Sequence, residues 1–213
     1  IVSLTQVKPG TRKDKEELIE VIEECINNYS YIYIFKVENM RNSYLKEVRE
    51  ALKPGRIFLG KNKIMQKALG QTESDAKKLN LDKFSKLLEG ECGLLFTEAK
   101  PEEITAYFKE FRKADYARHG FIADKEVKLP AGILYRGDDT FPHNMEPLLR
   151  GLGLNTHIER GNVCISNEHT ICKPGDKLTV QQADLLKHFY HQFAEFHIVP
   201  QYYYHEGAVT KIE

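Results

Sequence analysis

The sequence predicts an α/β protein: a layered α/β domain with a smaller mixed α+β domain inserted before its last strand. Short apolar runs alternate with repeats at helical spacing as far as residue 111, which is typical of layered α/β domains. Chain-breaking Pro and Gly residues become frequent after Arg112, and a final extended run follows at 195–204. We therefore expect the layered domain to comprise residues 1–113 and 194–213, and the insertion to comprise residues 114–193.

The layered domain is predicted to begin with a helix, a strand and a second helix. Residues 12–29 place apolar side chains at helical spacing. Residues 31–37 form a continuous β-branched and aromatic run, which is typical of a buried strand. Asn42 or Ser43 is expected to cap the next helix, over 42–52.

The rest of this domain is predicted to continue the alternation. Residues 56–59 are a short apolar run, and Gly60 separates this strand from a helix that opens at Lys61. Pro101 suits the first position of a later helix. The remaining expected elements are a loop at 71–80, a helix at 81–88, a strand at 92–97 and a helix at 101–111.

The insertion is predicted to consist of short pieces. They are a connector at 115–120, apolar segments between breakers at 128–142, a brief helix at 145–154, and strands within 157–171 around a Gly161-Asn162 turn. Thr179 and Gln182 form a capping box for a helix that runs to about Phe193. The last strand, at 195–204, most economically returns to the sheet of the layered domain.

Composition and charge narrow the classes of function. Hydrophobic residues make up 41% of the chain and charged residues 29%, as in ordinary globular proteins, and no apolar run approaches a membrane span. The four cysteines lie far apart, which favours reduced intracellular thiols. Net charge is zero, but nine basic residues against three acids give residues 36–70 a net charge of +6. A local field of that sign can attract a polyanion.

Catalytic and metal-binding patterns are weak. Gly55-x-x-x-x-Gly60-Lys61 matches the start of a phosphate-binding P-loop, but Asn62 stands where Ser or Thr should hold Mg²⁺. The residues between the glycines also belong in a strand. An enzyme acting on a nucleotide is therefore a minor alternative, and we expect no enzymatic activity, cofactor or small-molecule substrate.

Metal ligands are not expected either. His188 and His191 lie three residues apart on an expected helix, but no second pair of Cys or His lies at ligand spacing. Cys164 and Cys172 are eight residues apart.

Basic helix sides are the remaining candidate site. Asn42, Lys46 and Arg49 line one helix, and Asn62, Lys63 and Lys67 line another. Both helices follow parallel-type strands, so both should begin near the same edge of the sheet. Amides and hydroxyls among the cations suit phosphate contacts, and the aromatic residues fall in core strands, which favours structured RNA gripped by its backbone. The alternative is a solvated helix face without a ligand.

Several stretches carry a family resemblance. Residues 39–49 (NMRNSYLKEVR) and 60–65 (GKNKIM) resemble the RNA-binding domain of the large-subunit stalk-base ribosomal protein family. The messenger-RNA-turnover-protein-4 branch of that family, made of nucleolar assembly factors, is resembled by SLTQV (3–7), GLLFT (93–97), DYAR (115–118), FPHNMEP (141–147) and AEF (194–196).

The resemblance implies a function in ribosome assembly. A member of this branch would bind the stalk-base, or GTPase-associated-centre, region of large-subunit rRNA in nuclear pre-60S particles, as a placeholder for the paralogous ribosomal stalk protein. It would meet the neighbouring stalk-base ribosomal protein and pre-60S assembly factors in the nucleolus and nucleus, and shuttling to the cytoplasm stays open. The alternative is the mature stalk-base protein itself.

The RNA-facing residues follow by position. The resemblance implies Arg41, Asn42, Ser43, Lys46, Lys61, Asn62, Lys63 and Lys67, with Lys8, Arg12 and Lys13 beside them. Arg49 and Arg56 join this set from the charge pattern of the same segment.

Overall fold

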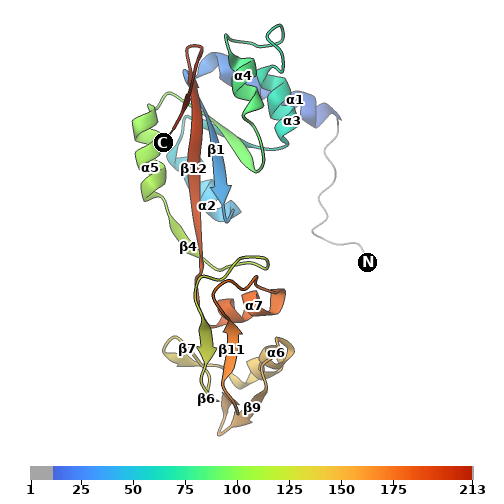
Figure 1. Ribbon diagram of the computed structural model, residues 1–213, viewed down its shortest axis with the longest axis vertical. Coiled ribbons are helices and arrows are strands. Elements are labelled where there is room, and N and C mark those ends of the chain that lie inside the picture. Colours follow the sequence, from blue (N-terminus) through green and yellow to red (C-terminus); the bar gives the residue numbers. More distant parts are fainter. Residues whose placement is uncertain (1–11, 213) are drawn as a thin grey trace. The chain divides into compact units, whose positions relative to one another are not determined.

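The computed structural model describes residues 12–212 in two compact units (Figure 1). Unit 1 comprises residues up to Arg112 and from His197 onward, and unit 2 is Lys113–Phe196. The expected insertion, 114–193, lies within unit 2. None of the described helices is both long and apolar enough to cross a membrane.

Unit 1 contains the elements expected from the alternating pattern, with one addition. They are α1 (Arg12–Asn28), β1 (Tyr31–Glu38), α2 (Asn42–Ala51), β2 (Arg56–Leu59), α3 (Asn62–Leu69), α4 (Leu81–Lys86), β3 (Cys92–Thr97), α5 (Pro101–Glu110), β12 (Ala194–His205) and β13 (Ala208–Lys211). The return of the last predicted strand to this sheet is confirmed, because β12 pairs with β1. Strand β13 was not predicted.

The main sheet has the strand order β13-β12-β1-β3-β2, and each of these pairings is antiparallel. The expectation of parallel-type strands is therefore wrong for neighbouring strands. β1 and β2 do run in the same direction, because both pair antiparallel with β3 between them. All six residues of β3 are buried. A Cβ atom on Gly93 would lie 2.6 Å from both Leu59 Cδ2 and Phe35 Cζ, so only glycine fits there.

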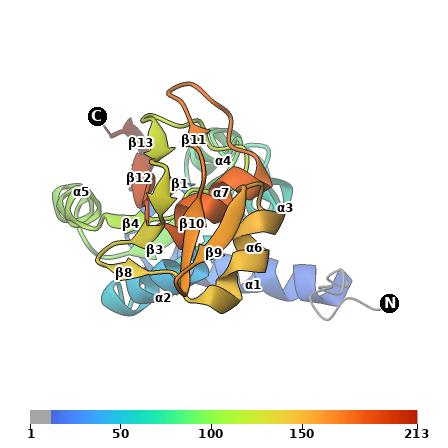
Figure 2. The same ribbon diagram turned by 90° about the horizontal axis from the view of Figure 1, so that it is seen from below.

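Helices cover both faces of this sheet (Figure 2). On one face, alternate residues of β1 and β3, such as Ile32 and Leu94, pack in one apolar cluster with α1, α3 and α4. The buried residues of α2 and α5 lie outside that cluster, among them Val48 and Phe108. They cover the opposite face, where Tyr33 is fully buried. Unit 1 therefore has three layers, with α2 and α3 on opposite sides of the sheet.

The C-terminal hairpin is tied to the polar loop before α4. Tyr204 Oη donates a hydrogen bond to the carbonyl oxygen of Leu79 at 2.8 Å. Asn80 Nδ2 donates to the carbonyl oxygen of Gly207 at 2.9 Å. These bonds join segments more than 120 residues apart in the sequence.

Unit 2 is built from short elements around a separate apolar core that includes Phe141, Leu149 and Val163. The elements are β4 (Lys113–Asp115), β5 (Val127–Leu129), β6 (Gly132–Ile133), β7 (Tyr135–Arg136), β8 (Asp139–Thr140), η1 (His143–Met145), α6 (Glu146–Gly151), β9 (Thr156–Glu159), β10 (Asn162–Ile165), β11 (His169–Cys172) and α7 (Val180–His188). The small sheets are β6-β10-β9, β11-β5 and β7-β8, and β4 pairs with the first residues of β12.

The β9–β10 turn differs by one residue from the prediction. Glu159 pairs with Asn162, so the turn residues are Arg160 and Gly161, with φ of 49° and 82°. Two consecutive left-handed residues are typical of the tight type I′ hairpin turn.

Helix α7 has the predicted start but ends earlier than expected. The capping box of Thr179 and Gln182 is confirmed. The helix ends at His188 rather than near Phe193, because Tyr190 adopts a φ of 60°. The N–H groups of Tyr190 and His191 then bond back to the carbonyl groups of Lys187 and Leu186, which is a Schellman motif. His188 and His191 consequently do not share a helix.

Candidate nucleic-acid interface

Helices α2 and α3 begin at the same end of the sheet. Lys36 of β1 pairs with Cys92 of β3, and Leu59 of β2 pairs with Gly93. β1 and β2 therefore finish where β3 starts, and the helix that follows each of them begins there. The predicted common edge is confirmed.

The basic sides of the two helices diverge from that edge. Lys46 and Arg49 lie on α2, and Lys63 and Lys67 lie on α3, whose buried sides cover opposite faces of the sheet. The fold brings together the beginnings of these helices rather than their exposed sides.

The start of α2 lacks the side-chain cap that the sequence predicts. Arg41 is the N-cap residue, in an extended conformation, and no side chain there accepts a capping hydrogen bond. Asn42 and Ser43 are instead the first two residues of the helix, and both are exposed. The prediction was wrong by one or two positions, because the left-handed Asn39 turns the chain before an extended Arg41.

The start of α3 borders a pocket of about 470 Å³. The residues that line it are Lys15, Gly60, Lys61, Asn62, Lys63, Ile64 and Gly90. Lys61 is the N-cap residue, again without a capping hydrogen bond from a side chain. Lys15 comes from α1, which packs against α3. Three lysines from two helices thus surround the positive end of a helix.

The Asn62 side chain holds this helix start in place. Its Nδ2 donates to the carbonyl oxygen of Gly90 at 2.8 Å, and Cys92 Sγ lies 3.5 Å from its Oδ1 as a donor. The amide that we expected to face RNA is therefore engaged within the protein, where it fixes α3 to the beginning of β3.

Helices α2 and α3 share a feature that the other described α-helices lack. Neither has a side-chain cap, and neither has an acidic residue in its first turn. Among the other α-helices of residues 12–212, α1, α4, α5 and α6 have Asp or Glu in the first turn, and α7 has its capping box. The free N–H groups and the positive dipole ends of α2 and α3 are thus uncompensated by the protein's own side chains.

The cations around these helix starts are also unpaired. Each is exposed, and within the described part of the chain the structure gives none of their side chains an ion pair or a hydrogen bond. They are Lys46, Arg49, Lys61, Lys63 and Lys67.

Other predicted residues have partners within the protein. Arg12 and Lys13 form exposed pairs with Glu16 and Glu17 on α1, at 2.8 and 3.9 Å, and such pairs are weak. Arg56 is exposed and lies beside the Cys25 thiol, whose pKa is raised by burial and lowered in part by this guanidinium. Lys8 lies outside the described residues.

Two lysines near the α3 pocket were missing from the predicted set. Lys15 lines the pocket directly. Lys36 lies near Cys92 and opposes the rise in the pKa of this thiol that burial causes. Counting charges included Lys36, but only the pairing of Lys36 with Cys92 shows that it lies at the same edge.

The P-loop-like stretch has a structural explanation. Residues Arg56–Leu59 form β2 and pair with β3, so they are not an open phosphate-binding loop. A Cβ atom on Gly55 would lie 2.7 Å from the carbonyl oxygen of Leu52 and 2.8 Å from that of Phe96. Close packing therefore explains this glycine.

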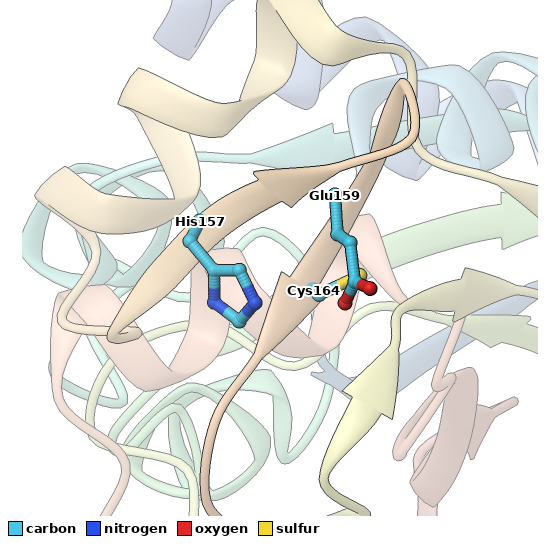
Figure 3. A group of neighbouring side chains, drawn as sticks. All are labelled: His157, Glu159 and Cys164. Atoms are coloured by element: carbon cyan, nitrogen blue, oxygen red, sulfur yellow. The ribbon is translucent and has the colours of Figure 1, made fainter.

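Unit 2 contains a separate group of candidate metal ligands. His157, Glu159 and Cys164 bring one ligand atom each within 4.8 Å of one another (Figure 3). The sequence search considered ligands close along the chain, whereas this group forms through strand pairing.

Comparisons with known proteins place the chain in a family. The model of ribosomal protein L10 matches residues 10–113, and that of the insertion domain in the 60S ribosomal protein of the same family matches residues 117–190. Ribosome assembly factor mrt4 of Neurospora crassa is 41% identical over 100% of this chain and 91% of its own length. The chain belongs to the mrt4 branch of the ribosomal L10 family.

Further relatives agree with this membership in the mrt4 branch. The mrt4 factor of Dictyostelium discoideum is 35% identical over 100% of this chain and 94% of its own. The large ribosomal subunit protein uL10 of Thermococcus sibiricus is 26% identical over 86% of this chain and 52% of its own. The family resemblance inferred from the sequence is confirmed.

The Asn62 contacts predict a structural role for this residue. Asn62→Ala should lower the free energy of unfolding by about 1 kcal/mol, because the carbonyl group of Gly90 loses its donor. Lys63→Ala, next to it and exposed, should change the stability by less than about 0.5 kcal/mol. Urea unfolding of both variants measures the difference, and equal midpoints would contradict this role.

Proposed function

We propose that this chain is a non-enzymatic ribosome assembly factor that binds the stalk-base, or GTPase-associated-centre, region of large-subunit rRNA. It does so in nuclear pre-60S particles, as a placeholder for the paralogous ribosomal stalk protein. The curated relatives named mrt4 are ribosome assembly factors by name. The observation that carries the RNA-binding part is the pair of uncapped helix starts, α2 and α3, at one end of the sheet among unpaired cations.

The chemistry of these helix starts suits phosphate groups. Backbone N–H groups at a helix N-terminus, with the dipole behind them, form a ready anion site. Each lysine that neutralises a phosphate also releases counterions, so affinity falls steeply with salt. Such contacts position the RNA without reading bases, and we propose that the factor recognises the folded shape of its rRNA.

The positions of the basic residues suggest how the RNA is held. Lys46 and Lys63 lie on helices that cover opposite faces of the sheet. A straight duplex along one face would meet only one of the two helices. A folded RNA whose phosphates converge on the end of the sheet would meet both helix starts, with Lys46 and Arg49 on one side and Lys63 and Lys67 on the other.

The partners and the location follow from the proposed role. The factor would contact the neighbouring stalk-base ribosomal protein and other pre-60S assembly factors. It would reside in the nucleolus and nucleus, and whether it shuttles to the cytoplasm depends on where it leaves the particle.

The rival function is that of the mature ribosomal stalk-base protein. Sequence identity favours the assembly factor, since it is 41% to the Neurospora crassa factor and 26% to the Thermococcus sibiricus ribosomal protein.

Cell fractionation distinguishes the two functions. The tagged full chain should sediment with nuclear pre-60S particles and be absent from polysomes, because a placeholder leaves before translation begins. Recovery of the chain in polysomes, at the stoichiometry of a ribosomal protein, would identify it as the mature stalk-base component.

Charge reversal on α3 tests the RNA surface. Lys63→Glu with Lys67→Glu should weaken binding to a stalk-base rRNA fragment by at least about tenfold and reduce the slope of log affinity against log salt by about two. Fluorescence anisotropy over a salt series measures both quantities. The matched control is Lys100→Glu with Lys109→Glu, two exposed lysines at and in α5. If both double variants bind equally well, α3 is not part of the interface.

An acid at the start of α2 should have opposite effects on stability and binding. Ser43→Asp places a carboxylate in the uncompensated first turn, which should raise the free energy of unfolding by about 0.3–1 kcal/mol. The same charge should repel phosphate and weaken RNA binding roughly tenfold, equivalent to about 1.4 kcal/mol.

The neutral Ser43→Asn variant, similar in size, controls for the Ser43→Asp change. It should leave RNA affinity within about twofold of the parent. Tighter or unchanged RNA binding by Ser43→Asp would remove the α2 start from the interface.

A further inference from the structure

We propose that His157, Glu159 and Cys164 form a Zn²⁺ site on the β9–β10 hairpin of unit 2. These residues lie outside the unit that carries the proposed RNA surface, and the inference does not depend on that surface. Their imidazole nitrogen, carboxylate oxygen and thiol sulfur lie within 4.8 Å of one another.

Strand pairing explains why these three side chains meet. His157 and Cys164 are directly paired across the antiparallel strands, and Glu159 lies two residues beyond His157 on the same face of β9. Figure 3 shows the three side chains on one side of the hairpin. The left-handed Arg160 and Gly161 fix the turn, and a slip of the register by one residue would separate the ligands.

The environment of Cys164 supports a role outside the apolar core. Its neighbours Val163 and Ile165 belong to the core cluster of unit 2, but Cys164 does not. The side chains of alternate residues point to opposite faces of a strand, so the sulfur lies under the outer face of the hairpin. The residue is only 3% exposed, whereas His157 and Glu159 are exposed and can rotate toward an ion.

The ligand types favour zinc over the hard divalent cations. Thiolate and imidazole suit Zn²⁺, whereas Ca²⁺ and Mg²⁺ take oxygen ligands. Bonds of about 2.0–2.3 Å in a tetrahedron place the ligand atoms roughly 3.3–3.8 Å apart, so closure around the ion requires side-chain shifts of about 1 Å. The thiol proton passes to solvent when the sulfur coordinates, and water takes the fourth position.

A hydroxyl beside the ligands can steady the imidazole. Ser166 Oγ lies 3.4 Å from His157 Nδ1. Hydrogen bonds of this kind orient ligating histidines in protein metal sites.

Calorimetric titration of the metal-free full chain with Zn²⁺ tests the site. We expect saturation at one equivalent per chain and no comparable binding of Mg²⁺. His157→Ala and Glu159→Gln should each weaken Zn²⁺ binding by at least about tenfold. The matched controls, His143→Ala and Glu168→Gln, change exposed residues of the same unit outside the site and should bind as the parent does.

Cobalt substitution tests the sulfur ligand separately. Co²⁺ bound to the parent should show a thiolate-to-cobalt charge-transfer band, which Cys164→Ser should abolish and Cys172→Ser, at a second buried free cysteine, should retain. Circular dichroism checks that each variant is folded, and the exposed His157→Ala and Glu159→Gln variants decide the question if Cys164→Ser is not. Absence of saturable Zn²⁺ binding, or equal loss in site and control variants, would overturn the proposal.

Discussion

The position of β3 between β1 and β2 is the constraint on which unit 1 depends. This strand is buried along its whole length and pairs antiparallel on both sides. Two strands antiparallel to the same neighbour must run in the same direction, so the helices after them begin at one end of the sheet. Gly93 permits the pairing, because the Leu59 and Phe35 side chains occupy the space of a Cβ atom. The arrangement of the proposed RNA surface thus follows from core packing rather than from the charged residues themselves.

The helix starts differ in a way that separates stability from function. The chain builds a complete capping box at Thr179 and Gln182, so it can stabilise a helix start fully. At the starts of α2 and α3 it provides neither a cap nor an acid, and cations surround them instead. Local departures from the most stable choice are expected where a protein binds a ligand. Phosphate groups would supply the missing negative charge.

Sequence periodicity predicts most of unit 1 because its strands and helices carry strong apolar patterns, as in β1 and β3. It does not predict β13, since residues 208–211 are short and largely exposed. The separation of Lys46 and Lys63 onto opposite faces depends on strand order, which periodicity does not contain. Asn42 and Asn62 show the same limit at single residues, because a backbone turn and a distant carbonyl group decide their roles. The His157–Cys164 pair likewise depends on hairpin register.

The pairing of β1 with β12 has a consequence for synthesis on the ribosome. Tyr31 pairs with His205, so one edge of β1 lacks its partner until residues 197–205 have emerged. The intervening residues 113–196 are contiguous and have their own core, so they can fold first. The nascent N-terminal part would meanwhile expose an open strand edge, the kind of surface that chaperones protect. We therefore expect unit 1 to complete its sheet only after unit 2 has been synthesised.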